Sequence, residues 1–161
     1  MKKIIFLLAV GIVVLACNKE EDKEIGSPQS KVDGISGSWL ISSVIQIDER
    51  NLPIRSRDIS SYYTSTSNKI AANFKSDKTF TMQSGDGINY LGTGAGTWSF
   101  DNDASPAYLF LNYQGQSTLK IALGGPTRSS DTELKLLYTS TCDTDTSSVP
   151  RVSYNYVFKR N

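Results

Sequence analysis

The stretch from Gly37 to Ile47 constrains the fold more than any other part of the chain, because its residues alternate between two faces. Such alternation is typical of a β-strand that buries one face. A later run, Gly96–Asp101, repeats the small-polar-Trp opening, so we expect Trp39 and Trp98 to lie in one core. In the first run, the alternation predicts a shared face for Trp39, Ile41, Ser43, Ile45 and Ile47.

Short alternating runs continue to the C-terminus, and none of them keeps the 3.6-residue period of a helix. Residues 58–68 are polar and predict a long connection with a short helical turn near 59–63. Short strands joined by tight turns favour an antiparallel meander, and such a sheet avoids free edges by pairing its last strand with its first. Eight or nine strands are predicted, at 37–47, 70–74, 79–83, 88–91, 96–101, 108–113, 117–123, 133–138 and 151–159.

The N-terminus has the pattern of an export signal. Lys2 and Lys3 precede an apolar run from Ile4 to Leu15, which is shorter than the roughly 18 residues that a membrane span needs. The run ends in Val14–Cys17, which resembles a bacterial lipobox. The resemblance implies a lipoprotein signal peptide over residues 1–16 and lipidation of Cys17, for example with palmitate. The alternative is an ordinary signal peptide whose cysteine is incidental.

A lipidated Cys17 would anchor the protein, because two or more acyl chains hold a protein stably on a bilayer. Residues 17–33 are then a lipidated N-terminus and flexible tether, and 34–161 are the folded domain. The charged segment Asn18–Glu24 resembles the export signal of surface lipoproteins in some Gram-negative bacteria. That resemblance implies an outer-membrane protein facing the outside of the cell. The alternative is a plain solvated spacer, with the domain facing the periplasm.

Several motifs of the predicted domain share the character of core and turn residues of one known family. Together they resemble the lipocalin-like domains of small bacterial lipoproteins, over residues 34–159. The resemblance implies an all-β, antiparallel up-and-down barrel of the calycin type, with an interior cup. The motifs are Gly-x-Trp at Gly37, the hairpin pattern of Phe74, Asp77, Thr79, Phe80 and Thr81, the run Gly96–Phe100, and the pair Leu109 and Leu111.

The composition argues against most kinds of catalysis. The chain has no histidine, which removes the commonest general base and most transition-metal sites, and Cys142 has no histidine to activate it. The pairs Asp101/Asp103 and Asp143/Asp145 could serve as acid and base or hold calcium, but carboxylates at such places usually form turns. A net charge of +1 gives no basic field for nucleic acid. We therefore expect a protein that is not an enzyme and uses no metal or cofactor.

These arguments predict a membrane-anchored protein that binds a small apolar or amphipathic ligand in its barrel. The alternative is a non-catalytic accessory module with a solid barrel, which engages a surface protein or a glycan. The eight tyrosines suit either a cavity wall or ordinary strand positions. The predicted rim of the cup is formed by residues 58–68 and 139–148. The predicted wall of the cup is Trp39, Ile41, Phe74, Phe80, Met82, Trp98, Phe100, Tyr154 and Tyr156.

Overall fold

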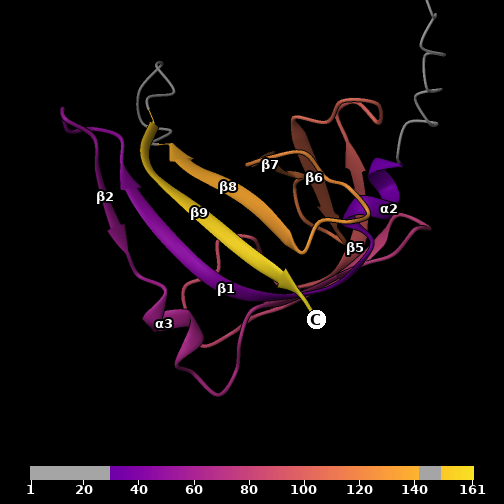
Figure 1. The fold of residues 1–161 in the computed structure, drawn as a ribbon, viewed down its shortest axis with the longest axis horizontal. Helices are drawn as coiled ribbons and strands as arrows, with labels where there is room; N and C mark the ends of the chain where they lie inside the picture. Colours follow the sequence, from indigo (N-terminus) through magenta and orange to yellow (C-terminus); the bar gives the residue numbers. More distant parts are fainter. Residues whose placement is uncertain (1–29, 142–149) are drawn as a thin grey trace, which may run out of the picture.

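A computed structural model describes residues 30–141 and 150–161, with the backbone alone for Pro150 and Arg151 (Figure 1). The described part is almost entirely β-structure. Its two helices are short: α2 (Lys31–Ile35) and α3 (Ser61–Thr64). The strands are β1 (Gly37–Asp48), β2 (Arg55–Asp58), β3 (Ala71–Phe74), β4 (Thr79–Gln83), β5 (Gly94–Phe100), β6 (Tyr108–Tyr113), β7 (Leu119–Leu123), β8 (Glu133–Thr141) and β9 (Pro150–Arg160).

The strands form one antiparallel sheet that closes into a barrel. The order along the sheet is β2-β1-β3-β4-β5-β6-β7-β8-β9, and β1 also pairs with β9 from Trp39↔Arg160 to Asp48↔Val152. Eight strands therefore close the barrel, and β2 is an extra strand beside the second half of β1. The predicted all-β antiparallel barrel is confirmed, as is the predicted pairing of the last strand with the first.

One β-bulge changes which residues of β1 point inward. The register with β9 shifts between Ile41 and Ser43, so Ser42 is the extra residue, and its hydroxyl donates to the carbonyl of Val157 (2.9 Å). A bulge inserts one residue and so reverses the alternation beyond it. Trp39 and Ile41 point inward as predicted, but Val44 is the next buried residue. The prediction was wrong for Ser43, Ile45 and Ile47, which lie on the outer face.

The predicted strand at 88–91 is wrong, because this segment is part of the loop between β4 and β5. The Asn89 side chain folds the loop on itself: its amide donates to the Gly92 carbonyl (2.7 Å), and its oxygen accepts from the Leu91 backbone N–H (3.0 Å). Such local bonds compete with pairing to a neighbouring strand. Leu91 is nevertheless fully buried, so the loop contributes a side chain to the core.

The sequence did not predict β2 or α2. The sequence of β2, Arg-Ser-Arg-Asp, contains no apolar residue and all four residues are exposed, so no hydrophobic alternation marks it. Helix α2 has five residues, too few for a helical period, although Ser30 caps it by accepting from the Asp33 backbone N–H (3.2 Å). Helix α2 spans the boundary between tether and domain that the sequence predicted at residues 33 and 34.

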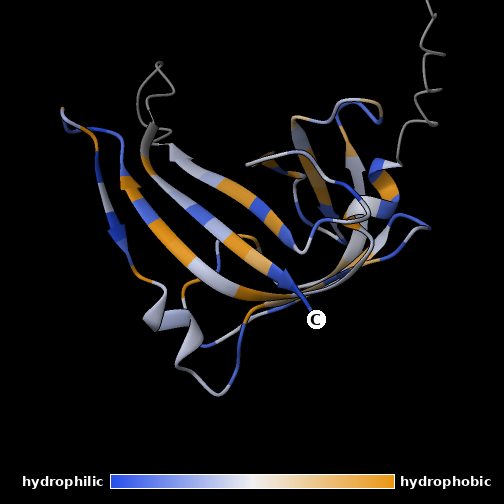
Figure 2. Ribbon diagram, in the orientation of Figure 1, coloured by the Kyte–Doolittle hydropathy of each residue, from blue (hydrophilic) through white to orange (hydrophobic). Residues whose placement is uncertain are grey.

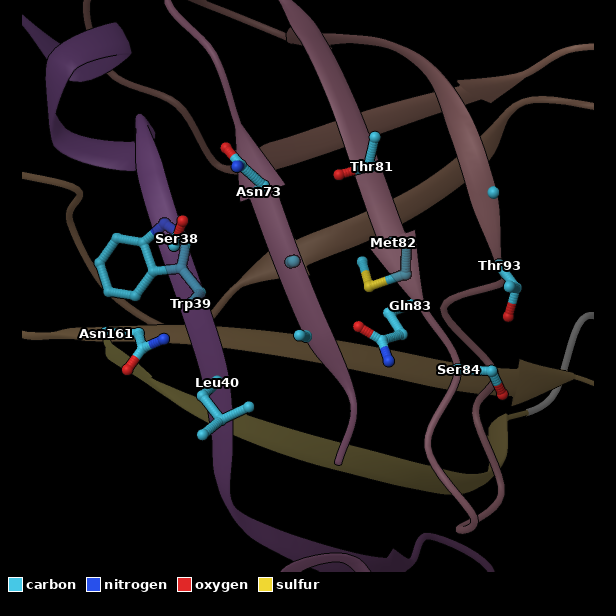
Figure 3. A pocket seen from close by; sticks show the side chains of 13 residues that line it. Ser38, Trp39, Leu40, Asn73, Thr81, Met82, Gln83, Ser84, Thr93 and Asn161 are labelled. Atoms are coloured by element: carbon cyan, nitrogen blue, oxygen red, sulfur yellow. The ribbon is translucent and has the colours of Figure 1, made fainter. Parts of the chain in front are cut away.

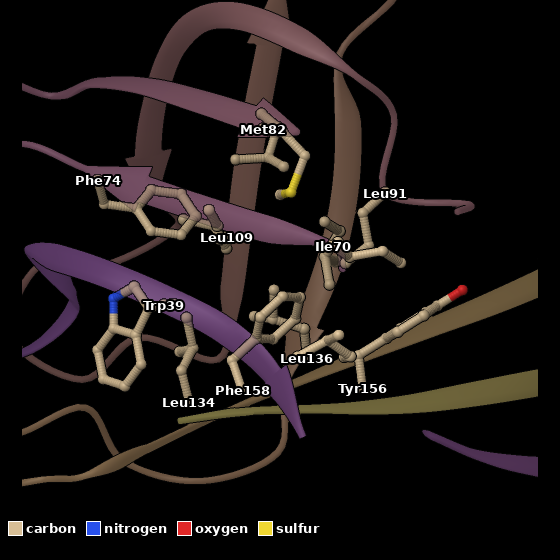
Figure 4. Close-up of a cluster of buried hydrophobic side chains, with 14 of the residues drawn as sticks. Trp39, Ile70, Phe74, Met82, Leu91, Leu109, Leu134, Leu136, Tyr156 and Phe158 are labelled. Atoms are coloured by element: carbon tan, nitrogen blue, oxygen red, sulfur yellow. The ribbon is translucent and has the colours of Figure 1, made fainter. Parts of the chain in front are cut away.

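Buried aromatic and aliphatic side chains fill the barrel (Figure 4). Trp39, Trp98, Phe74 and Phe158 are each no more than 1% exposed. Hydrophilic and hydrophobic residues alternate at the start of β8, where Glu133 and Lys135 are exposed and Leu134 and Leu136 are buried, as expected for a strand with one buried face (Figure 2). The core confirms the prediction that both tryptophans lie in one interior.

The N-terminal helix covers one end of the barrel. Ile35 of α2 is fully buried in the core, and its carbonyl accepts a hydrogen bond from the Trp39 indole N–H (2.7 Å). The Arg160 guanidinium lies 4.3 Å above the Trp39 ring, and Gly34 lies against the backbone of Thr127 in the β7–β8 connection. We refer to this end as the closed end. Neither helix of the described part is long and apolar enough to cross a membrane.

Candidate functional site

The end of the barrel opposite α2 is more open, and we refer to it as the mouth. It is formed where β1 ends, beside the β1–β2 turn, α3 and the β4–β5 loop; in Figure 1 it lies at the left, away from α2. The backbone N–H of Ile59 donates to the Val44 carbonyl (3.0 Å), and the Ser60 hydroxyl accepts from the Val44 N–H (3.0 Å). These bonds hold the segment that leads into α3 against the side of β1.

The mouth contains a cleft of about 360 Å³. Pockets for small organic ligands begin at roughly 300 Å³ and combine apolar walls with a few polar groups. This cleft has that composition, with tyrosine and isoleucine side chains beside one amide, one guanidinium and one carboxylate. We call it the mouth cleft, and its lining residues are Gln46, Arg57, Ile59, Tyr62, Tyr63, Asp86, Gly87, Ile88 and Tyr154.

A cluster of tyrosines extends from the mouth cleft into the barrel. The Tyr90 ring stacks on Tyr138 with centroids 5.3 Å apart and lies 4.7 Å from Tyr154. The Tyr154 hydroxyl accepts from the Gln46 amide (3.1 Å) and donates to the Tyr90 hydroxyl (3.5 Å). The ring of Tyr154 also stacks on Tyr156 at 6.3 Å. The Gln46 amide and the hydroxyls of Tyr154 and Tyr90 therefore form one hydrogen-bonded chain beneath the opening, with aromatic faces around it.

The β4–β5 loop is fixed to this cluster through one carbonyl. The Ile88 carbonyl accepts from the hydroxyls of both Tyr63 (2.9 Å) and Tyr156 (3.3 Å). Gly87 lies flat against the Tyr63 ring, where a Cβ atom would come within 2.6 Å of the ring. Tyr63 is itself buried and packs edge-on against Tyr156. The wall of the mouth cleft formed by this loop is thus held by specific contacts.

Three tyrosines at the mouth, Tyr63, Tyr90 and Tyr156, have pKa values above the ordinary value of a phenol. Burial raises the pKa of Tyr63 and carries that of Tyr156 well above its ordinary value. The hydrogen bond with Tyr154, with a smaller contribution from burial, raises the pKa of Tyr90 to about 12. Phenols that stay protonated offer hydrogen-bond donors and aromatic faces, and these features suit the binding of an amphipathic molecule.

The structure places all the predicted wall residues in the barrel interior, and each is at most 8% exposed. They pack against one another, as with Phe74 against Trp98 and Phe80. Among them, Tyr154 lines the mouth cleft. Trp39, Ile41, Phe74, Phe80, Met82, Trp98, Phe100 and Tyr156 fill the barrel as part of its core.

Another hollow in the described part, which we call the outer groove, lies on the outer face of the sheet (Figure 3). It measures about 740 Å³ and crosses β1, β3, β4 and β5. The cross-strand positions Ser38, Asn73 and Thr81 line it with small polar side chains, and Trp39 and Met82 border it from the core side. The hollow holds no charged side chain, and its lining gives no convergent set of polar groups.

The candidate acid–base and calcium residues serve other purposes where they are described. The Asp101 carboxylate accepts from the backbone N–H groups of Ala107 (3.0 Å) and Tyr108 (2.9 Å), which folds the β5–β6 turn. Asp103 makes an exposed ion pair with Lys78 (3.2 Å). Asp143 and Asp145 lie outside the described residues, as do Cys17 and Cys142. Within the described ranges, no three Asp, Glu, Cys or His residues gather as metal ligands would.

Ile59, Tyr62 and Tyr63 of the mouth cleft lie in the predicted rim at 58–68, and Tyr154 belongs to the predicted wall. The sequence analysis missed the other five lining residues, which are Gln46, Arg57, Asp86, Gly87 and Ile88. Tyr62 and Tyr63 belong to the connection at 58–68, whose short helical turn was predicted and is confirmed as α3. Gln46 was placed on the wrong face because no residue in the sequence marks the bulge at Ser42. The richness of the segment in tyrosine was the available signal, since large aromatic side chains in a polar connection suit a ligand wall.

One family comparison gives a match. The sequence model described as "Domain of unknown function (DUF5004)" matches residues 17–159 of the chain. No curated protein and no solved structure matches the chain.

Proposed function

We propose that this chain, which belongs to the DUF5004 family of domains of unknown function, is a lipid-anchored, lipocalin-like protein that binds a small amphipathic ligand in its mouth cleft. The observation that carries the proposal is the cleft itself. About 360 Å³ of space lies above the tyrosine cluster, at the end of the barrel that α2 does not cover. Aromatic faces would hold the apolar body of a ligand, and Gln46 with the phenol hydroxyls would pair its polar groups.

The anchor would place the cleft away from the membrane. The proposed lipidation site, Cys17, precedes α2 in the chain, and α2 covers the closed end. The 12 residues of β1 then run toward the mouth, roughly 36 Å at about 3.3 Å per residue. The family match also begins at residue 17, the first residue after the proposed signal peptide. A barrel attached by its closed end would open its cleft to the surrounding solution.

We propose that the anchored domain lies on the outer membrane and faces outward, with the periplasmic face as the alternative. Incorporation of an alkyne analogue of palmitate tests the anchor. Labelling should be lost in Cys17→Ser and kept in Cys142→Ser, which removes the chain's other cysteine. If labelling is lost in neither variant, the anchor is refuted.

The orientation is tested by digestion with a protease added to intact cells, since a periplasmic domain would survive it.

Binding can be tested with N-phenyl-1-naphthylamine, a neutral aromatic probe whose fluorescence rises in apolar sites. The protein is residues 17–161 with Cys17→Ser, which keeps the whole mature chain free of lipid. We expect saturable binding at one site. Ile88→Asp should weaken this binding at least fivefold, because it puts a charge into the cleft wall. The change should leave the core intact, since Ile88 is 63% exposed.

Ile54→Asp is the matched control for Ile88→Asp. Ile54 is 57% exposed at the same end of the barrel and does not line the mouth cleft, so its replacement should leave binding unchanged. Two results would refute the proposal: no saturable binding by the unmutated chain, or equal binding by the Ile88 and Ile54 variants. Thermal unfolding of each variant shows that the barrel is intact.

The filled interior favours a second function. Aromatic side chains fill the barrel, and the mouth cleft lies at its end. A solid barrel is what a non-catalytic accessory module would have. Such a module would engage a surface protein or a glycan through its outer face or its loops. Co-purification of a stoichiometric partner from cells, together with a failure to bind the probe, would favour this function over ligand binding. Neither function requires catalysis, and we propose that the protein is not an enzyme.

A further inference from the structure

The extra strand β2 places two arginines beside the mouth cleft. In the register with β1, Arg57 lies opposite Gln46 and Arg55 opposite Asp48. Directly opposite residues of an antiparallel pair project from the same face of the sheet. Gln46 points toward the tyrosine cluster, because its amide donates to the Tyr154 hydroxyl. Both arginines therefore project on the tyrosine side of the sheet.

A second hollow adjoins the mouth cleft at these arginines. It measures about 350 Å³, and it shares Gln46 and Arg57 with the mouth cleft. Arg55 lines its far side, two residues along the strand from Arg57. Arg57 therefore lines both hollows and Arg55 lines the second, so the two arginines border adjoining hollows, one of which is walled by tyrosine and isoleucine.

The carboxylates around these two hollows accept hydrogen bonds within their own loops, whereas the arginine side chains have no such partner. The Asp86 carboxylate accepts from the backbone N–H (3.3 Å) and side-chain amide (3.2 Å) of Asn68, and the Asp48 carboxylate accepts from the Arg50 backbone N–H (3.0 Å). The side chains of Arg55 and Arg57 make no hydrogen bond or ion pair with another residue that the structure describes, although the backbones of both residues pair with β1. The carboxylates are thus bound within their own loops, whereas the guanidinium donors remain available.

We propose that the ligand of the mouth cleft is an anionic amphipathic molecule, whose acidic group is bound by Arg57 and Arg55 and whose aromatic or aliphatic body lies against the tyrosines. The inference rests on the proposed function of the same cleft. A guanidinium presents donors in a planar fork that matches carboxylate, sulfonate or phosphate oxygens. Ligands of this class carry one such group on a small apolar body.

The test compares two probes that share one aromatic body. 8-Anilinonaphthalene-1-sulfonate carries a sulfonate that N-phenyl-1-naphthylamine lacks. We expect the mature chain to bind the sulfonate probe at least fivefold more tightly than the neutral one. Arg57→Gln should remove most of that advantage, and Arg55→Gln should have a smaller effect in the same direction. Raising sodium chloride from 0.05 to 0.5 M should weaken the sulfonate probe alone, because salt screens exposed charges.

Arg50→Gln is the matched control, since it removes the same charge from an exposed residue of the β1–β2 turn that lines neither hollow. Equal affinity for the two probes, or equal effects of Arg57→Gln and Arg50→Gln, would overturn the inference. If the neutral probe still binds and responds to Ile88→Asp, the proposed function survives that result. Binding of neither probe would overturn both.

Discussion

Replacement of Arg160 by methionine tests how the closed end of the barrel is held. The guanidinium of Arg160 donates to three backbone carbonyls, those of Ser36 (2.7 Å), Gly34 (3.0 Å) and Asp131 (3.3 Å). It also lies over the Trp39 ring, with its central carbon 4.3 Å from the ring centroid. One side chain from the last strand thus ties α2 and the β7–β8 connection to the core.

The expected loss follows from these contacts. A hydrogen bond to a charged group contributes about 1.5–3 kcal/mol, and stacking of a cation on an indole contributes from about 0.5 kcal/mol at exposed sites to about 2 kcal/mol when desolvated. Arg160 is half-buried, so water will replace part of what methionine removes. We therefore expect Arg160→Met to lower the free energy of unfolding by about 3 kcal/mol, well below the simple sum. Lysine has no planar fork, so Arg160→Lys should recover less than half of this loss.

Urea unfolding followed by circular dichroism measures this loss, provided that the dependence on urea concentration stays the same in all variants. Arg128→Met is the matched control, because Arg128 is exposed in the same β7–β8 connection and bonds through its backbone N–H. The control should stay within about 0.5 kcal/mol of the unmutated chain. A loss below 1 kcal/mol in Arg160→Met, or full stability in Arg160→Lys, would refute the reasoning.

Three further predictions concern the core, the cleft and the tyrosines. Trp98→Ala should cost about 4 kcal/mol in the same urea assay, since it empties a fully buried site; a cost under 2 kcal/mol would mean that the core is loosely packed. Gly87→Ala should displace the Tyr63 ring and weaken binding of the neutral naphthylamine probe several-fold, whereas Gly125→Ala, with open space around it, should not; equal binding by both would count against the cleft geometry. The stability of the fold should fall as the pH rises above 10, because the unfolded chain then loses phenolic protons that the folded chain keeps; the pKa of Tyr90, for example, is raised to about 12. Urea midpoints at pH 8, 10 and 11 measure this fall, which should be smaller in Tyr90→Phe.

The barrel could be predicted from the sequence because each of its main strands shows an alternation of apolar and polar residues that can be recognised without knowing its partners. The hairpin at 70–83 and the long terminal strand show clean alternation between apolar and polar residues, and both were predicted within a residue or two. Closure followed from the apolar face of the last strand, which needs a partner. These features depend on residue type at a fixed period and not on distant contacts.

The candidate site could not be predicted in the same way, because it depends on departures from regular pairing. The bulge at Ser42 turns Gln46 inward, and strand β2, without apolar residues, brings Arg57 opposite Gln46. Ile88 reaches the cleft because its loop folds on Asn89 and does not form a strand. Each of these depends on tertiary contacts that single-residue preferences do not encode. The predicted cup wall consequently identified the core, with Tyr154 as its member in the mouth cleft.

The most direct test of ligand binding at the mouth is to locate a bound molecule by nuclear magnetic resonance. Amide and side-chain resonances of the mature chain would be followed while N-phenyl-1-naphthylamine is added. We expect the largest shifts at Ile59, Tyr62, Tyr63 and Ile88, with the residues of the outer groove, such as Asn73 and Thr81, unchanged. Shifts confined to the outer groove, or no shifts at saturating probe, would contradict a ligand site at the mouth of the barrel.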